Sequence, residues 1–187
     1  MGSSFFSTIF KNQTLSQALR AELEDDLSFL VRSLPGIIGF AARYLVYKTL
    51  FKRIESMPFI FPNVRFLHMG EISLGKSVLI NTNTYIYGLG GVSIGDKTLI
   101  SPGCSIVAGD HDIAVGKCIL ENPCHRRGIV IESNCWIGAN CVVLGGVHVA
   151  EGTVIGAGSV VTRSTEPHSV YVGAPARKIR NRIKADE

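Results

Sequence analysis

The fold is decided by residues 131–165, which read IESNCWIGANCVVLGGVHVAEGTVIGAGSVVTRST. An aliphatic residue returns at every sixth position of this stretch, at Ile131, Ile137, Val143, Val149, Ile155 and Val161. Such a period fits neither an amphipathic helix, which repeats at about 3.6 residues, nor an isolated strand, which repeats at about two. It is typical of a parallel β-helix, in which short strands coil around one axis and stack their aliphatic side chains inward.

The same register occurs upstream of residue 131. It comprises Leu74, Ile80, Ile86, Ile94, Ile100 and Ile106, with a shift of two residues at 88–91. The residue four places after each aliphatic is usually small, as a tight coil corner requires: Val78, Thr84, Gly90, Thr98, Cys104, Cys135, Cys141, Val147, Thr153, Ser159 and Thr165. Three faces of six residues make one coil, so we expect Ile137 to stack on Ile155.

Glycine directly follows the aliphatic residue at four corners, Gly75, Gly95, Gly138 and Gly156. We expect these glycines to serve a bend between faces, through a positive φ and a close approach of two backbones.

The chain before the repeats has a helical pattern. Between Ser16 and Met57 the leucines 19, 23, 27, 30 and 34 recur at three to four residues, and Pro35-Gly36 interrupts the pattern. We therefore divide the chain into an N-terminal helical extension, residues 1–62, and a β-helix domain, residues 63–187. The domain includes a protruding loop at 112–128 and a C-terminal tail.

The second helical segment, Ile37 to Lys52, is apolar and is followed by Arg53, but it carries basic and aromatic residues: Arg43, Tyr44, Tyr47, Lys48, Phe51 and Lys52. It is too short and too charged to span a bilayer. Two interpretations stay open. The helix packs on the coil or on a neighbouring subunit, or it lies on an anionic membrane with its basic residues near the headgroups.

Composition narrows the class of protein. The 187 residues are 46% hydrophobic with a formal net charge of +4, and they lack the basic platform interleaved with aromatic residues that single-stranded nucleic acid requires. The five cysteines show no paired framework spacing. Three of them occupy the small corner positions, and Cys118 and Cys124 fall in the loop. A reducing cytoplasm is the simplest environment for such a set, and Met1 to Phe10 lacks the basic start of a signal peptide.

Catalytic chemistry is expected where the repeat breaks, because a regular coil uses its residues for its own packing. The break opens with Ala108-Gly109-Asp110-His111-Asp112. A histidine that ends a coil strand at the base of a loop can reach a ligand while the coil holds its backbone. Histidine is also the side chain that titrates closest to neutral pH, so His111 is the candidate general base.

Three blocks in order carry a family resemblance: Cys135-Trp136-Ile137-Gly138-Ala139-Asn140, residues 154–162 (VIGAGSVVT), and residues 172–180 (VGAPARKIR). With them the chain resembles the hexapeptide-repeat acyltransferases, closest to the sugar O-acetyltransferase branch, over about two thirds of its length, residues 64–183. The resemblance implies a mainly β fold with a left-handed parallel β-helix, an acetyl-CoA-dependent transfer to a sugar hydroxyl, and a homotrimer. It also implies that active sites lie between neighbouring coils.

The resemblance implies a role for individual residues. His111 matches the catalytic histidine, and Asn83, Asn81 and Trp136 match or neighbour positions beside the acceptor. Backbone groups along the pantetheine arm of coenzyme A are implied at Gly138, Ala139, Gly156, Ala157 and Ser159. Basic positions near its phosphates are implied at Arg163, Arg177, Lys178 and Arg180. The acid that orients His111 stays open among Asp110, Asp112 and Glu121.

The N-terminal extension departs from the small sugar acetyltransferases and resembles enzymes that decorate surface polysaccharides. We therefore expect a cytoplasmic protein, with peripheral contact at the inner face of the membrane, whose acceptor is a glycan or a small molecule. The alternatives are N-acetylation of an amino sugar and acetylation of serine or an antibiotic. A non-catalytic scaffold is a further alternative.

A zinc carbonic anhydrase is disfavoured, because the five histidines at 68, 111, 125, 148 and 168 lack the close pair that a three-histidine site needs. We expect no resident metal.

Overall fold

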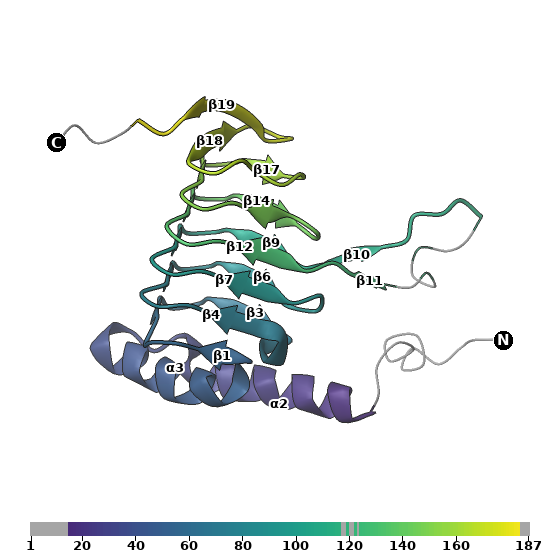
Figure 1. The fold of residues 1–187 in the computed structure, drawn as a ribbon. Coiled ribbons are helices and arrows are strands. Elements are labelled where there is room, and N and C mark those ends of the chain that lie inside the picture. The colour runs from purple at the N-terminus through teal and green to yellow at the C-terminus, as the bar shows by residue number, and fades with distance from the viewer. Residues whose placement is uncertain (1–14, 117–118, 120–121, 123, 184–187) are drawn as a thin grey trace.

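The computed structural model describes residues 15–116, 119, 122 and 124–183. The start of the chain, Cys118 and Glu121 lie outside the described residues, so nothing further is said of them. The described chain forms a three-sided parallel β-helix, two helices across the N-terminal end of the coil, and one arm that projects from its side (Figure 1).

Three sheets form the faces of the coil. Sheet A contains β1 (Arg53–Ile54), β4 (Ile72–Leu74), β7 (Val92–Ile94), β12 (Ile129–Ile131) and β15 (His148–Val149). Sheet B contains β2 (Phe59–Ile60), β5 (Leu79–Ile80), β8 (Leu99–Ile100), β13 (Trp136–Ile137), β16 (Val154–Ile155), β18 (Ser169–Val172) and β19 (Arg177–Asn181). Sheet C contains β3 (Arg65–Leu67), β6 (Tyr85–Tyr87), β9 (Ser105–Val107), β14 (Val142–Leu144) and β17 (Val160–Val161). A short 3₁₀ helix, Met69–Glu71, links β3 to β4.

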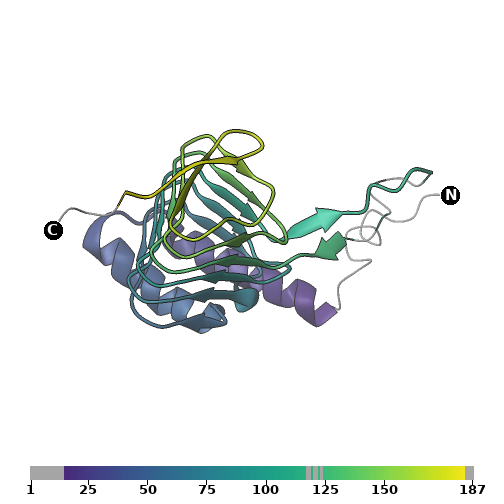
Figure 2. The ribbon, with the colours of Figure 1, turned by 45° about the horizontal axis from the view of Figure 1, so that its top comes forward.

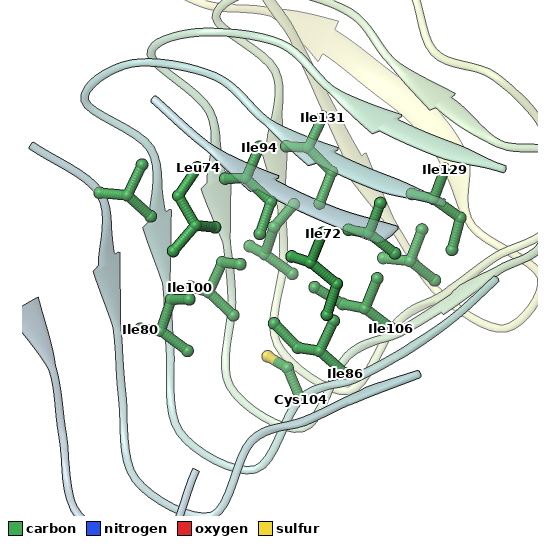
Figure 3. Close-up of a cluster of buried hydrophobic side chains, with 14 of the residues drawn as sticks. Ile72, Leu74, Ile80, Ile86, Ile94, Ile100, Cys104, Ile106, Ile129 and Ile131 are labelled. Atoms are coloured by element: carbon green, nitrogen blue, oxygen red, sulfur yellow. The ribbon is translucent and has the colours of Figure 1, made fainter. Parts of the chain in front are cut away.

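The aliphatic residues of the repeat fill the centre of the coil in stacked columns (Figure 3). Ile137 pairs in register with Ile155, which confirms the eighteen-residue coil in the C-terminal half. In the N-terminal half Ile80 pairs with Ile100, so those coils are two residues longer. The mainly β fold predicted from the sequence is thus confirmed, with its N-terminal helices and its protrusion.

The corner glycines act through close contact and not through a positive φ. A Cβ added to Gly138 would lie 2.6 Å from the backbone nitrogen of Ala157, and Gly75, Gly95 and Gly156 are similarly crowded. The positive φ angles fall two residues later, at Ser77, Lys97, Asn140 and Gly158. The expectation of positive φ at the four glycines was therefore wrong, because the bend of each corner falls beyond them.

The helices are α2 (Leu15–Arg32) and α3 (Gly36–Leu50), separated at Pro35 as predicted. The leucine column of α2 does not mark its inner face. Leu19, Leu23 and Leu30 are exposed, while Glu24 and Ser28 are buried. Glu24 accepts the backbone N–H of Met69 (2.8 Å), and Ser28 hydrogen-bonds the Tyr47 hydroxyl (3.2 Å). These polar contacts attach α2 to the coil and to α3, together with the packing of Leu27 and Val31 on the core.

On α3 the buried residues are Gly39, Arg43, Tyr47 and Leu50, which supports the interpretation of a helix packed on the coil. Phe51, directly after α3, is also buried. The interpretation that placed Arg43, Tyr47 and Phe51 at a membrane surface was wrong for those three residues. Strands β1 and β2 precede residue 63, so the coil itself begins inside the segment assigned to the extension.

The protrusion is a two-stranded antiparallel arm. Strand β10 (Gly109–His111) pairs with β11 (Cys124–Arg126), and the chain returns to the coil at β12 (Figure 2). The arm leaves the coil after Ala108, slightly earlier than the predicted loop.

Candidate active site

His111 lies on the arm and not at the end of a coil strand. Its Cα partner is Cys124 on β11, and its side chain is exposed. The last coil strand before it, β9, ends at Val107, so the hairpin of β10 and β11 fixes the backbone of His111. The imidazole is therefore presented to solvent beside the edge where sheet C meets sheet A, which we call the C–A edge.

The two described acids near His111 are engaged with backbone groups. An Asp110 oxygen, Oδ1, accepts the backbone N–H of His111 (2.9 Å), and Oδ1 of Asp112 accepts that of Ala114 (2.9 Å). Both carboxylates thus shape the arm. The structure records no contact between either of them and the imidazole ring.

A pocket of about 190 Å³ lies below the base of the arm, between α2 and the C–A edge. It is lined by Arg20, Ala21, Glu24, His68, Gly70, Glu71, Leu89 and Arg126. Its upper wall, Arg126, pairs across the arm with Gly109, two residues before His111. The sequence did not identify this pocket, because its polar residues are far apart along the chain and only the coil brings them together.

The polar groups of the pocket balance in charge. Arg20 Nε donates to Oε1 of Glu24 (2.9 Å), and the Glu24 carboxylate is buried. Burial lowers the pKa of His68, an effect that the charges of Glu24 and Glu71 oppose and that of Arg126 reinforces. The His68 ring also meets the ring of Tyr87 edge-on, at 5.2 Å between centroids. Paired guanidinium and carboxylate groups beside a neutral imidazole and an aromatic ring suit an uncharged polar ligand.

The acceptor candidates Asn83 and Asn81 lie at a different edge, where sheet B meets sheet C. Asn83 is exposed and has a φ of 58°, so it is the turn residue of its corner. The same corner position is held by Asn140 in a later coil, with a φ of 57°. Asn81 is partly buried, and its N–H donates to Ile100 O (2.9 Å). A structural role therefore accounts for Asn83 without a ligand, whereas the backbone bond of Asn81 does not require an asparagine side chain.

Successive turns stack into one ridge, which we call the B–C edge. Gly103 N–H donates to Thr82 O (3.0 Å), Asn140 N–H to Pro102 O (2.9 Å), and Gly158 N–H to Ala139 O (2.8 Å). The ridge therefore aligns the candidates Asn83, Ala139 and Ala157 along the coil axis.

The structure separates the expected coenzyme A contacts into two groups. Ala157 is exposed and Ala139 is partly exposed, although Ala139 O already accepts the N–H of Gly158. Gly138 and Gly156 already donate to the next coil, and the buried Ser159 hydroxyl donates to Gly156 O (2.6 Å) and accepts Gly173 N–H (3.0 Å). Those three residues hold the coil together.

The basic candidates do not form one cluster. Arg177 begins β19 directly after the turn that continues the B–C edge, opposite Val172 of β18. Lys178 is paired with Glu166, and Arg180 Nη1 donates to Asn181 O (3.3 Å). Arg163 follows β17 on the way to the C–A edge. Arg177 is thus the basic candidate that the structure places nearest the ridge.

Trp136 lies on the outer face of sheet B, in β13, and is 49% exposed. Its indole N–H donates to the Ser101 hydroxyl (3.0 Å). The ring therefore flanks the B–C edge on its sheet B side and does not approach the arm of its own chain.

His111 and the B–C edge lie at opposite ends of sheet C within one chain. Residues 103–111 run from the Gly103 turn through β9 into the arm, and eight extended residues span at most about 25 Å. A substrate bridging His111 and the ridge of the same chain would have to cross that face.

None of the cysteines in the described part of the coil is suited to act as a nucleophile. Cys104, Cys135 and Cys141 are buried free thiols, and burial raises the pKa of Cys104 and Cys135 to about 11.

Among the described residues, no three His, Cys, Asp or Glu side chains are gathered as a metal site would require. No helix in this part of the chain is long and apolar enough to cross a membrane.

The sequence of this chain is similar to those of known proteins. The model of the bacterial transferase hexapeptide family, with six repeats, matches residues 128–163. Galactoside O-acetyltransferase of Escherichia coli strain K12 is 31% identical over 138 residues, which cover 74% of this chain and 68% of that enzyme. This chain spans 59 to 68% of the length of the first three curated relatives that it matches.

Solved structures extend the match to the helices. A hexapeptide-repeat acetyltransferase of Vibrio cholerae O1 biovar eltor, complexed with acetyl coenzyme A, has a TM-score of 0.84 at 24% identity, over 91% of each chain. A galactoside acetyltransferase in complex with coenzyme A has a TM-score of 0.83 at 25% identity, over 91% of this chain and 84% of that one.

Proposed function

The chain belongs to the hexapeptide-repeat acetyltransferases, and we propose that it transfers the acetyl group of acetyl-CoA to a sugar hydroxyl of a surface glycan or its precursor. The observation that supports this most is the division of the site. An exposed histidine on a two-stranded arm lies at one edge of the coil, and a ridge of small residues lies at another.

The donor half of the proposed site is the B–C edge. The pantetheine arm of acetyl-CoA lies along the ridge, where Ala139 and Ala157 permit close approach, and Arg177 meets the phosphates at the end of the coil. Binding of acetyl-CoA and of coenzyme A in the two neighbouring structures supports this half of the proposal.

The acceptor half is the pocket below the arm. A sugar ring that is hydrogen-bonded to Glu24, His68 and Arg126 directs one of its hydroxyl groups toward His111. The His111 imidazole takes the hydroxyl proton while the oxygen attacks the thioester carbonyl, and a backbone N–H stabilises the resulting oxyanion. When the C–S bond breaks, the proton passes from His111 to the coenzyme A sulfur, so the histidine is regenerated without an acetyl-enzyme.

The two halves come from neighbouring subunits of a homotrimer. Each arm reaches over the B–C edge of the next copy, so the substrate need not cross sheet C. We place the trimer in the cytoplasm, where acetyl-CoA is available, in peripheral contact with the inner face of the membrane. Four free cysteines among the described residues suit that reducing compartment.

The first test measures thiol release from acetyl-CoA with a panel of free sugars, amino sugars, nucleotide sugars and lipid-linked glycans. The His111→Ala variant is expected to lower kcat by about 10²–10⁴ without an equal change in KM. The control is His125→Ala, an exposed histidine on the partner strand of the same arm. Equal rates for His111→Ala and wild type would refute the assignment of the base. Transfer to amino sugars alone would replace O- by N-acetylation.

The second test asks whether one site uses two subunits. Ala157→Trp blocks the ridge, and His111→Ala removes the base, so each variant alone is expected to be inactive. Random mixed trimers recover about a quarter of the wild-type activity if base and ridge come from different copies. No recovery in verified mixed trimers would place both halves in one chain.

A further inference from the structure

The end of the coil that the helices cover presents an apolar outer face. We call it the helical end face, and it comprises Phe29, Leu30, Leu34, Ile37, Ile38, Leu45, Lys48, Lys52 and Arg53. The six large apolar side chains of this set are between 39% and 87% exposed. Exposed apolar residues scattered singly are normal on a protein surface, but six large ones within residues 29–45, on two adjoining helices and their link, indicate an interaction site.

The inner contacts of α3 explain why these side chains point outward. The stripe of Gly39, Arg43 and Tyr47 is buried against the coil and α2. Arg43 is fixed there by hydrogen bonds to Ile60 O (2.8 Å) and Leu34 O (2.6 Å). Since these contacts set the rotation of α3, Ile38 and Leu45 necessarily face away from the coil, and no described residue covers them.

The charge of this segment has one sign. Residues 27–54 contain no aspartate or glutamate but five basic residues, Arg32, Arg43, Lys48, Lys52 and Arg53. Arg43 is buried, and Arg53 lies 3.1 Å from Glu55, whereas Lys48 and Lys52 are exposed at the end of α3. Exposed acids of α2, Glu22 and Asp26, precede the segment. An apolar surface with exposed cations at one border is complementary to an apolar layer with anionic groups above it.

The shape of the end suits a planar partner. Both helices lie across the N-terminal end of the coil, so their outer sides face away from all the strands above them (Figures 1 and 2). We propose that the helical end face docks on an anionic lipid bilayer, with Ile37, Ile38 and Leu45 inserted at the boundary of the acyl chains and Lys48 and Lys52 among the headgroups. A second copy of the chain fits less well, because a symmetric contact would bring the same cations together.

The test uses the full-length protein and vesicles of phosphatidylcholine with or without phosphatidylglycerol, separated by sedimentation. Wild type is expected to sediment with the anionic vesicles and to bind them less as salt rises. Two variants divide the surface: Ile38→Asp with Leu45→Asp, and Lys48→Glu with Lys52→Glu. Each is expected to lower the partition coefficient at least about tenfold.

The control is Ile183→Asp, because Ile183 is 82% exposed and Ile38 is 80% exposed, but Ile183 lies near the opposite end of the coil. Circular dichroism confirms that all the variants are folded. Failure of wild type to bind either vesicle, or equal loss in the control, would overturn the proposal. The proposal would also be overturned if the wild-type assembly had twice the mass of the Ile38→Asp assembly, since that result would assign the face to a second copy of the chain. None of these readouts involves acetyl transfer, so the docking proposal fails or stands separately from the enzymatic one.

Discussion

Glycines at the coil corners have two different structural roles that the sequence alone does not distinguish. Gly138 has an ordinary φ but no room for a side chain, because an added Cβ would lie 2.6 Å from both Ala157 N and Ile155 O. Gly158 has a φ of +71° and nothing within 4 Å of an added Cβ. The first glycine is required by contact between coils, and the second by backbone conformation alone.

Alanine substitutions separate the two tasks. Gly138→Ala forces one coil from the next and is expected to lower the free energy of unfolding by about 3 kcal/mol. Gly158→Ala adds only the strain of a left-handed residue, about 1 kcal/mol. Urea unfolding of both variants beside wild type measures the difference, and the contact argument is wrong if Gly158→Ala is the more destabilised.

His68, in the candidate acceptor pocket, makes the free energy of unfolding depend on pH. Burial lowers its pKa below the ordinary value of 6.5, so in acid the unfolded chain binds a proton more readily than the folded one. The stability that the neutral ring supplies is therefore present above about pH 6.5 and is lost as the pH falls toward the folded pKa.

The measurement is urea unfolding of wild type and His68→Asn at a series of pH values from about 7 down to about 5. Asparagine tolerates the positive φ of this position, which is 56°. We expect stability to fall less steeply with acid in the variant than in wild type. Identical slopes in the two proteins would contradict the burial argument.

At the residue scale the sequence predicted the inward columns well. Small residues such as Cys104 and Thr153 are fully buried where the period of six placed them. Function was harder to predict for Asn83, because a turn with positive φ and a ligand contact both favour asparagine. The pocket residues could not be predicted, since Arg20, His68 and Arg126 meet only after the coil has formed.

At the scale of elements, one buried cation, Arg43, adds to the Ser28–Tyr47 hydrogen bond in holding the two helices together. Arg43 donates to Leu34 O (2.6 Å) just beyond α2 and to Ile60 O (2.8 Å) in β2, so it joins α2, α3 and the first coil. Removing the guanidinium would take this donor away from the buried carbonyl of Ile60 and the partly buried carbonyl of Leu34.

The substitution Arg43→Met keeps much of the side-chain volume but no donor. We expect the free energy of unfolding to fall by about 3 kcal/mol. Lys48→Met, on the exposed side of the same helix, should change it by less than about 0.5 kcal/mol. Thermal or urea unfolding compares the two, and equal effects would show that Arg43 is not what attaches α3.

Some features of the helices and strands could be predicted from the sequence, and others could not. The break at Pro35 was readable because proline disrupts a helix locally. The inner face of α2 was not readable, because Glu24 and Ser28 are polar and are buried only through partners on the coil and α3. The arm was expected as a loop since its pairing, Gly109 with Arg126, joins residues without a repeating pattern.

At the scale of the whole molecule, the repeat predicts the coil but not what surrounds it. The period of six determines that three faces form, and the relation between edges follows from the order of the strands. The arm and the ridge lie on different edges, which a list of matched motif residues could not reveal. The proposed trimer brings these edges together, and parallel coil axes would turn all three helical end faces toward one plane.

That arrangement gives the last prediction, which rests on both the proposed transfer and the proposed docking. Two coil steps of about 4.8 Å separate β3 from β9, and a helix is about 10 Å thick, so the base of the arm lies about 20 Å above a docked bilayer. If both proposals hold, we expect the acceptor to be a lipid-linked glycan whose sugar stands at that height. Anionic vesicles carrying the acceptor should raise kcat/KM at least about tenfold over a soluble glycan of the same sugar. Ile38→Asp with Leu45→Asp should lose this gain and keep the rate on the soluble glycan. If the variant also loses the soluble rate, the end face supports the enzyme's structure and not its approach to the membrane.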